Sequence, residues 1–229
     1  MPAVRMGKEL GMDQQQEEFS DLRERMIVRQ IKGRGIQDEA ILQAMRVVPR
    51  EAFVMDNYRQ FAYDDTPLPI PGSQTISQPY VVALMIRALR LKATDRVLEI
   101  GTGSGYAAAL LGQIAAQVHT VERLRQLVNF ARQNLAALAY NNVIVHQGDG
   151  TLGWSEKAPY DAIVVAAGGP EVPDSLKQQL QIGGRLVMPV GDSERRQYLI
   201  CLTREDKIDF RRTNLGAVAF VPLIGEEGW

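Results

Sequence analysis

Apolar positions in the second half of the chain alternate between runs of strand length and longer segments at helical spacing. The strand-like runs are "RVLEI", "QVHTVE", "NVIVHQ", "YDAIVVAA" and "GRLVMPV". Between them lie segments with helical periodicity, including "GYAAALLGQIA", "RLRQLVNFARQNLAALA" and "PDSLKQQL". Short apolar runs that alternate with helices are typical of a parallel sheet covered on both faces. The pattern therefore predicts a doubly wound, mostly parallel α/β fold.

The two ends of the chain depart from this alternation. "QYLICLTRE" and "GAVAFVPLI" are both strand-like without a strong helix between them, so we expect an antiparallel C-terminal edge. Upstream, "DLRERMIVRQIKGRGI" predicts a helix ended by Gly33 and Gly35, and "DEAILQAMRVV" a second helix with Asp38 as N-cap. "PYVVALMIRALRL" is expected to be a helix with Pro79 in its first turn. The proline-rich "FAYDDTPLPIPGSQ" before it should be an ordered loop, because proline restricts φ.

These patterns divide the chain into a tail and one domain. Residues 1–18 are polar, and we expect a flexible tail there. Residues 19–229 are expected to form a single domain. Within it, 19–78 supply N-terminal helices and a loop, and 79–229 supply the α/β core and the C-terminal strands.

Composition narrows the range of functions. The 26 basic and 27 acidic residues give a net charge of −1, without the basic stripe that nucleic-acid binding favours. Cys201 is the only cysteine, so an intramolecular disulfide and a Cys-based zinc site are impossible. His119 and His146 are the only histidines, and we expect them to lie far apart, each in a strand-like stretch, so we expect no metal site. The N-terminus has no apolar signal core, and no apolar stretch is long enough to span a bilayer, so we expect a cytoplasmic protein that binds no membrane.

A glycine loop carries the strongest signal for a ligand. In "VLEIGTGSGYAAALL" a buried strand leads through Gly101, Gly103 and Gly105 directly into a helix. Glycines at such a turn allow positive φ and close approach of a ligand to the backbone. The dinucleotide fingerprint would need glycine at position 106, where Tyr106 stands, and the phosphate loop of nucleotide hydrolases is absent here.

The remaining pattern, E-x-G-x-G-x-G beginning at Glu99, resembles motif I of class I S-adenosylmethionine-dependent methyltransferases, which have a Rossmann-like fold. S-adenosylmethionine carries a cationic amino group and a sulfonium, and an acid at the strand end suits this charge. The alternative is a turn that only packs the helix against the sheet.

Two further acids follow successive strands. Glu122 ends "VHTVE", 21 residues after Gly101, where ribose hydroxyls are bound in this topology. Asp149 in "HQGDG" follows the next strand. Alternatively, Glu122 is a surface acid at a helix start and Asp149 an Asx-turn residue. Three acids and a glycine loop at successive strand ends favour a ligand site over these separate structural roles.

The stretch "GSQTISQPYVVALM" before motif I narrows the resemblance to a family. Together with "MIVRQIKGRGIQDEAILQAMRVVPREAFV", "HQGDGTLGW", "YDAIVVAAGGPEVPDSLKQQLQIGGRLVMPVG" and the closing "FVPLIG", it is similar to the protein-L-isoaspartate O-methyltransferases. The similarity runs from about residue 26 to residue 225. The tail before about residue 19 and the ending "EEGW" depart from the family without overlapping a motif.

The resemblance implies methyl transfer from S-adenosylmethionine to the free carboxylate of L-isoaspartyl residues in damaged peptides and proteins, leaving S-adenosylhomocysteine. The ester then re-forms a succinimide, whose hydrolysis returns some normal aspartate. For the substrate, it implies that Ser77 orients the carboxylate and that the backbone of Val221, Pro222 and Leu223 contacts the peptide. For the cofactor, it implies a site formed by Thr75, Ile76, Ser77, Glu99, Gly101, Thr102, Gly103, Gly105, Glu122, Arg123, Asp149, Gly150 and Ile224.

The chemistry agrees with the residues of "GSQTISQPYVVALM", which contains no His, Cys or acid. A carboxylate with a pKa of about 3.5 to 4 is already ionised at pH 7, so it attacks a methyl group without a general base. The enzyme then has to align the reacting groups and exclude water. Ser77 could equally be a capping residue of the following helix, and both roles are compatible.

Three alternative functions share part of this pattern. A methyltransferase for a small molecule or RNA would share the glycines and acids but would not need the Ser77 block. A protein that binds S-adenosylmethionine without catalysis, and a nicotinamide-dependent oxidoreductase, are further alternatives, and Tyr106 counts against the latter. We expect a monomer that acts on isoaspartyl peptides and binds neither metal nor nucleic acid.

Overall fold

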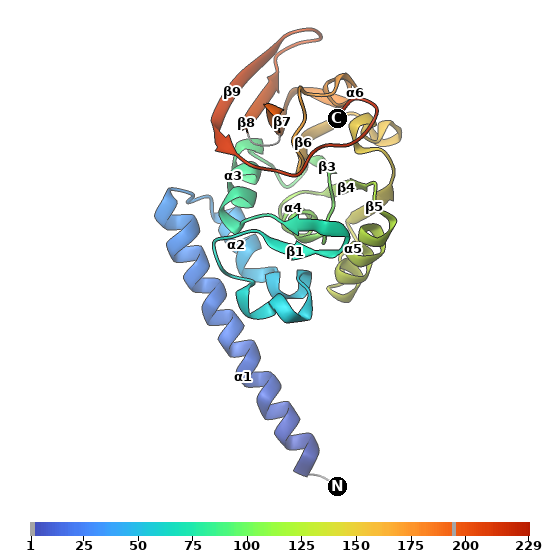
Figure 1. Cartoon of the computed structure of the whole chain (residues 1–229). Coiled ribbons are helices and arrows are strands. Elements are labelled where there is room, and N and C mark those ends of the chain that lie inside the picture. The colour runs from blue at the N-terminus through green and yellow to red at the C-terminus, as the bar shows by residue number, and fades with distance from the viewer. Residues whose placement is uncertain (1–2, 194–195) are drawn as a thin grey trace.

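The computed structural model describes residues 3–193 and 196–229, and within them a seven-stranded sheet forms the centre of the molecule (Figure 1). In spatial order the strands are β5 (Val143–Gln147), β4 (Gln117–Glu122), β3 (Arg96–Ile100), β6 (Tyr160–Val165), β7 (Leu180–Ser193), β8 (Arg196–Arg204) and β9 (Phe210–Val218). The first five are parallel, and β8 and β9 add antiparallel pairs. The predicted α/β fold with an antiparallel C-terminal edge is confirmed.

The strand order reverses at β3. From β3 the chain proceeds to β4 and β5 on one side, and then crosses to β6 and β7 on the other. Ile100 pairs with Val121 on β4 and with Val165 on β6, so the carboxyl ends of three strands lie side by side. In open α/β sheets this reversal leaves a crevice at the carboxyl ends, where ligands bind.

Alternating strand residues face two apolar clusters, one on each side of the sheet. Val97, Val164 and Val187 pack into the larger cluster, under most of the helices. Leu98 and Ile163 pack into the smaller one, with residues of α6. The helices are α1 (Ala3–Met26), α2 (Glu39–Val47), α3 (Pro79–Leu89), α4 (Tyr106–Ile114), α5 (Arg125–Ala137) and α6 (Asp174–Gln179).

The N-terminal addition differs in detail from its prediction. The helix α1 continues as a π-helical turn (Ile27–Ile31) and a 3-10 turn (Lys32–Arg34), and ends at Gly35, whose φ is 88°. Asp38 occupies the N-cap position of α2, but its side chain makes no capping hydrogen bond. The flexibility of residues 1–18 stays a prediction. Residues 1 and 2 lie outside the described residues, and the backbone from Ala3 onward is the start of α1.

The proline-rich segment before α3 is ordered by a small hairpin. Strand β1 (Leu68–Ile70) pairs antiparallel with β2 (Gln74–Ile76) through a 3-10 turn (Pro71–Ser73). Pro79 then opens α3, as predicted. Four other 3-10 turns lie in the connections: η3 (Arg50–Phe53), η4 (Asp56–Phe61), η6 (Gly150–Leu152) and η7 (Ser155–Lys157).

The predicted strand "GAVAFVPLI" is wrong beyond Val218. The last strand, β9, begins earlier, at Phe210, and pairs with β8 as a hairpin. After Val218 the chain leaves the sheet and crosses the carboxyl ends of the strands, where Pro222 forms an isolated bridge with Gly168. Pro222 has no N–H to donate, so a continued ladder would lose a bond there.

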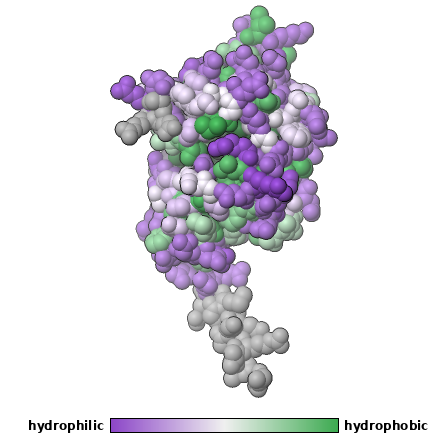
Figure 2. All heavy atoms as spheres, turned by 45° about the vertical axis from the view of Figure 1, so that its right-hand side comes forward, coloured by the Kyte–Doolittle hydropathy of each residue, from purple (hydrophilic) through white to green (hydrophobic). Residues whose placement is uncertain are grey.

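Figure 2 shows one face on which hydrophilic residues predominate and apolar ones gather in small patches. Among the described residues, no helix combines the length and apolar content needed to cross a membrane.

Candidate active site

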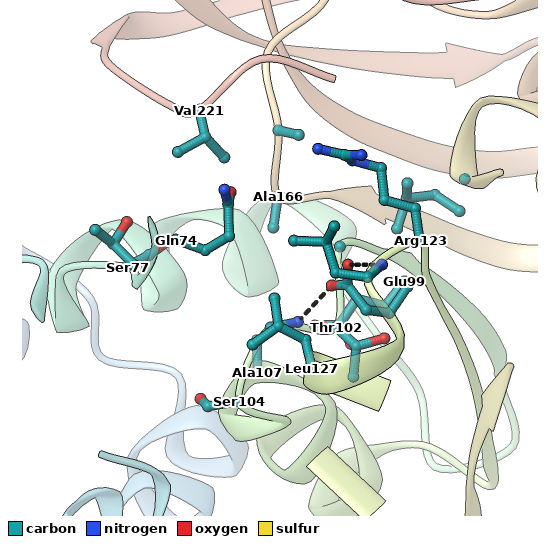
Figure 3. A pocket seen from close by; sticks show the side chains of 18 of the residues that line it. Gln74, Ser77, Glu99, Thr102, Ser104, Ala107, Arg123, Leu127, Ala166 and Val221 are labelled. Carbon is teal, nitrogen blue, oxygen red and sulfur yellow. Dashed lines mark hydrogen bonds between the residues drawn. The ribbon is translucent and has the colours of Figure 1, made fainter. Parts of the chain in front are cut away.

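A cavity opens at the carboxyl ends of β3, β4 and β6. We name it the cofactor cavity. Three parts of the chain line it: β2 and the start of α3, the strand ends with the glycine loop, and the crossing segment after β9. Figure 3 shows Ser77 at the start of α3, on the other side of the cavity from Glu99 and Arg123, with Val221 on the crossing segment.

The structure brings nearly all of the predicted site residues to this cavity. Those that line it are Thr75, Ile76, Ser77, Glu99, Gly101, Thr102, Gly103, Glu122, Arg123, Gly150, Val221, Pro222, Leu223 and Ile224. Gly105 and Asp149 do not line it.

The glycine loop has the backbone conformation that its sequence predicts. Gly101, Gly103 and Gly105 have φ values of 89°, 56° and 89°, a region that favours glycine. Gly105 is the N-cap of α4, so it shapes the turn and does not reach the ligand space. At Gly150 a Cβ atom would lie 2.4 Å from Ile100, so only glycine fits this close approach.

Glu122 is held inside the site rather than on the surface. It is 6% exposed, and its carboxylate accepts hydrogen bonds from the Gly103 N–H (3.0 Å) and the Leu124 N–H (3.0 Å). These bonds join the glycine loop to the end of β4. The carboxylate faces the cavity from the position predicted for a ribose contact.

Glu99 lies deeper and is 1% exposed. Its Oε2 accepts a hydrogen bond from Thr120 Oγ1 (2.6 Å), which in turn lies 2.6 Å from Thr102 Oγ1. Its Oε1 is buried without a partner among the described residues. Burial raises the pKa of the Glu99 carboxyl to about 8, and the nearby Glu122 charge adds to the effect, while the Thr120 hydroxyl opposes it. An unpartnered carboxyl oxygen in an acidic cavity fits a cationic ligand group.

Ser77 does not cap its own helix. Gln78 is the N-cap of α3, and no side chain there makes a capping hydrogen bond. The backbone at Ser77 is fixed by Arg50, whose Nη2 donates to the Ser77 carbonyl (2.8 Å) and whose Nε donates to the Ala62 carbonyl (2.7 Å). Arg50 is fully buried, and this burial lowers the pKa of its guanidinium. The guanidinium lies over the Tyr106 ring, 4.7 Å from the ring centroid, and this contact opposes the shift.

A second hollow, which we name the acceptor groove, meets the cofactor cavity at Ser77. It runs between α3 and the end of β9, and it shares Thr75, Ser77, Ala166, Val221 and Pro222 with the cofactor cavity. Its floor is largely apolar, with Val81, Leu84, Leu215 and Phe220. The hydroxyl of Ser77 therefore lies at the junction of two separate binding spaces.

Part of the backbone of the crossing segment, residues 219–225, is already hydrogen-bonded within the protein. Gly168 donates to the Val221 carbonyl (2.8 Å) and accepts from the Leu223 N–H (2.7 Å). The Leu223 carbonyl accepts from Trp229 (2.9 Å). Among the described residues the Pro222 carbonyl has no such partner, which leaves it available to a peptide.

Asp149 binds the C-terminal end of the chain. Its Oδ1 accepts from the Thr151 N–H (2.9 Å) and hydroxyl (2.7 Å), and its Oδ2 accepts from the Glu226 N–H (2.8 Å). Burial opposes ionisation, but these hydrogen bonds outweigh it and lower the pKa of the Asp149 carboxyl. The ending "EEGW" overlaps no motif in the sequence, yet it contacts a motif residue in the fold.

The two histidines are neighbours, which corrects the view that they lie far apart. Strands β4 and β5 are adjacent, and His119 Nδ1 lies 2.9 Å from His146 Nε2. The His146 ring stacks on Trp154 at 4.0 Å. Burial lowers the pKa of His119 to about 4, and it also lowers the pKa of His146. Among the described residues no three potential metal ligands come together.

Several lining residues were missed at the sequence level. Ala166 follows β6 at the same sheet edge, so the strand-end argument that selected Glu122 could have found it. Gln74, Ser104, Ala107, Leu124 and Leu127 also line the cavity, and nothing in their types distinguishes them. Arg50 and Thr120 do not line the cavity, but they donate hydrogen bonds to Ser77 and Glu99, which do. Only the fold reveals these contacts.

A family model described as protein-L-isoaspartate(D-aspartate) O-methyltransferase matches residues 22–228. The chain belongs to this family. The resemblance inferred from motif I and the Ser77 block is thereby confirmed, and with it the enzyme class.

Relatives with high sequence identity to this chain carry the name of the same family. The chain is 60% identical over 204 residues to "Protein-L-isoaspartate O-methyltransferase" of Rhodopseudomonas palustris, covering 89% of this chain and 94% of that one. It is 61% identical over 207 residues to "Protein-L-isoaspartate O-methyltransferase 2" of Pelobacter propionicus, covering 90% and 92%.

Solved structures give the same result. A protein-L-isoaspartate O-methyltransferase superposes with a TM-score of 0.82 at 33% identity, over 90% of this chain and 67% of that one. A protein described as a putative protein-L-isoaspartate O-methyltransferase, from Plasmodium falciparum and in complex with S-adenosyl-L-homocysteine, has a TM-score of 0.75 at 26% identity. The match covers 90% of this chain and 97% of that one.

Proposed function

We propose that this protein transfers a methyl group from S-adenosylmethionine to the free carboxylate of L-isoaspartyl residues in damaged peptides and proteins, with Ser77 as the residue that orients that carboxylate. The observation that carries the residue assignment is the position of Ser77. Its hydroxyl stands where the cofactor cavity meets the acceptor groove, without a capping bond to its own helix.

The residues present in the cofactor cavity fit this donor. Glu99 offers a buried, unpartnered oxygen to the cationic amino group, and Glu122 faces the space suited to the ribose hydroxyls. Gly101, Gly103 and Gly150 leave room beside the backbone for the bound molecule. When bound, S-adenosylmethionine supplies a methyl group on a positively charged sulfur.

The remaining predicted contacts are part of the proposal. Thr75, Ile76, Thr102, Arg123 and Ile224 line the same cavity. Gly105 contributes by shaping the turn. Asp149 contributes through the segment that follows it, because its carboxylate oxygens bind Thr151 and Glu226. Val221, Pro222 and Leu223 border the acceptor groove or the cavity, with the Pro222 carbonyl open to a peptide N–H.

The chemistry requires no proton transfer by the protein. The isoaspartyl carboxylate is ionised at pH 7, so one of its oxygens forms the new bond to the methyl carbon while the carbon–sulfur bond breaks. The chain aligns the two groups: Arg50 fixes the backbone at Ser77, and the Ser77 hydroxyl donates to the carboxylate. The apolar groove floor excludes water from the anion.

A labelling experiment tests this function. Methyl-labelled S-adenosylmethionine is incubated with an isoaspartyl peptide and with the matching aspartyl peptide. We expect label in the first and not in the second. Equal labelling of both, or of neither, would contradict the proposal, and label in an RNA or a small acceptor would favour the alternative methyltransferase.

The proposal includes a monomeric, cytoplasmic enzyme that needs no metal and binds neither nucleic acid nor a membrane. Its near-neutral charge supports the absence of a nucleic-acid partner. Activity after treatment with a chelator, and mass in solution by light scattering, test the metal and monomer parts directly.

A further inference from the structure

Four arginines line a pocket at the end of the acceptor groove farthest from Ser77. The pocket lies between the end of α3 and the faces of β7, β8 and β9, and it is open to solvent. Arg87 and Arg90 come from the helix end, and Arg185 and Arg211 come from strands. We name it the arginine pocket.

Strand register explains why the strand residues converge. Arg185 on β7 is opposite Thr203 on β8, and Thr203 is opposite Arg211 on β9. The three side chains therefore share one row on one face of the sheet. Cys201, two residues from Thr203, forms part of the floor, where burial raises the pKa of its thiol and the charges of Arg185, Arg211 and Arg90 act against that rise.

Positive charge in this pocket is incompletely balanced. Arg87 lies 3.7 Å from Asp38, and Arg211 lies 2.7 Å from Glu205. Within the described residues Arg90 and Arg185 form no ion pair, and no carboxylate lines either the arginine pocket or the acceptor groove. The whole chain carries a net charge of −1, so this excess is local.

The cofactor cavity, the acceptor groove and the arginine pocket form one continuous series. The acceptor groove shares Leu84 and Leu215 with the arginine pocket, as it shares Ser77 with the cofactor cavity. Tyr80, Leu84, Arg87 and Ala88 line the two hollows at helical spacing along one face of α3. Figure 1 shows α3 close to β8 and β9 on the same side of the molecule. The acidic end of this series suits the cationic donor, and the basic end suits an anionic acceptor chain.

We propose that the arginine pocket binds acidic side chains of the same polypeptide whose isoaspartyl carboxylate lies at Ser77. This inference rests on the proposed function. The helix rises about 1.5 Å per residue, so Arg87 and Arg90 lie roughly 12–16 Å along α3 from Pro79. An extended peptide covers about 3.3 Å per residue, so glutamates or aspartates about four to five residues from the isoaspartyl residue reach the guanidinium groups.

The dipole of α3 explains only half of the cluster. Arg87 and Arg90 follow the favourable placement of cations at a helix C-terminus. Arg185 and Arg211 come from strands and gain nothing from that dipole. Guanidinium groups pair well with carboxylates through two parallel hydrogen bonds, so the four together suit an acidic segment.

The test compares three isoaspartyl peptides: a neutral one, and two with a pair of glutamates four and five residues before or after the isoaspartyl residue. We expect at least one acidic peptide to have a kcat/KM roughly threefold to tenfold higher than the neutral peptide, through a lower KM, as expected for two partly exposed charge pairs. About 0.5 M salt should remove the difference.

Variants locate the effect. In the double variant Arg185→Gln/Arg211→Gln, the ratio of acidic to neutral kcat/KM should fall to half of the wild-type ratio or less, because only Arg87 and Arg90 remain in the pocket. Methylation of the neutral peptide reports that the variant is folded. Arg212→Gln is the matched control, because Arg212 pairs with Leu202 and so points to the other face of the sheet. It should keep the wild-type ratio.

Equal kcat/KM for all three peptides with the wild-type enzyme would overturn the inference, and so would an acidic preference as large in the double variant as in the wild type. If no isoaspartyl peptide is methylated, the proposed function fails, and the inference that rests on it fails too. Methylation of the neutral peptide separates these two results.

Discussion

At the scale of single residues, Ser77 is the position where chemistry and local structure compete for one hydroxyl. Its side chain makes no capping hydrogen bond to α3, so the hydroxyl is available to a substrate. We expect Ser77→Ala to lower kcat/KM for an isoaspartyl peptide by roughly 10- to 100-fold, the effect of losing one hydrogen bond to a charged group. The melting temperature and the affinity for S-adenosylhomocysteine should stay close to wild type, as measured by scanning fluorimetry and calorimetry.

The exposed Ser155, in η7, provides a matched control as Ser155→Ala. Wild-type turnover in the Ser77→Ala variant would remove Ser77 from the reaction. A large fall in melting temperature would instead return it to a structural role.

A second prediction at this scale concerns Glu99, because the free-energy cost of burying its carboxyl group depends on pH. The folded protein raises the pKa of this carboxyl from 4.5 to about 8. The unfolded chain therefore releases the proton at a lower pH than the folded protein. Stability should fall as pH rises from about 4.5 to about 8, by roughly 1.4 kcal/mol for each unit of the pKa difference.

Glu99→Gln should remove most of this fall. Denaturant unfolding at pH 5 and pH 8, without ligand, gives the difference in unfolding free energy for each protein. We expect that difference to be smaller in Glu99→Gln than in the wild type and in the exposed control Glu171→Gln. The same difference in all three proteins would mean that Glu99 is ionised in the folded state.

At the scale of elements, the N-terminal addition supports the site through one buried side chain. Arg50 in η3 donates to the carbonyls of Ala62 and Ser77, and so joins the addition to the start of α3. Arg50→Lys replaces a planar fork by a single ammonium group that cannot serve both carbonyls. We expect a loss of about 1–3 kcal/mol in unfolding free energy and a lower kcat for the isoaspartyl peptide. Arg59→Lys, at an exposed site of η4, is the control and should change neither.

The segment after β9 is the second element that the site depends on. Asp149 binds the backbone of Glu226, and Trp229 donates from its ring nitrogen to the Gly168 carbonyl (2.9 Å). We expect Asp149→Ala to weaken the binding of S-adenosylmethionine, measured by calorimetry, and to speed carboxypeptidase digestion of residues 225–229.

A chain that ends at Ile224, and so keeps every residue that lines the cavity, separates two explanations of that effect. If Asp149 acts through the segment, the truncated chain should bind the cofactor as weakly as Asp149→Ala does. Unchanged affinity in Asp149→Ala would remove Asp149 from the cofactor site altogether.

Elements defined by local patterns were predictable, and those defined by distant contacts were not. The glycine loop and the starts of α3 and α4 are determined by residues within one turn of each other. Their local sequence was therefore sufficient to predict them. The end of β9 depends on what crosses the strand ends, and the strand prediction through Ile224 was wrong for that reason. The contact between His119 and His146 depends on β4 and β5 being neighbours, which a separation of 27 residues along the chain conceals.

At the scale of the whole molecule, the cofactor cavity has walls from three separate regions. Residues 74–77 come from the N-terminal addition, 99–104 from the centre of the sheet, and 221–224 from the crossing segment. The sequence motifs identified all three, but their meeting at one point results from the strand order, which no single motif contains.

A ligand that fills this cavity should therefore stabilise all three regions together. At 100 times its dissociation constant, S-adenosylhomocysteine should add about 2.7 kcal/mol to the unfolding free energy, by mass action. Hydrogen exchange at a few seconds to minutes should slow in 74–77, 99–104 and 221–224 at once. The exposed turn 205–209, which lies outside the cavity, should exchange at the same rate with and without ligand. Protection confined to 99–104 would show that the cofactor rests on the glycine loop alone, and that the two outer walls close only around the peptide.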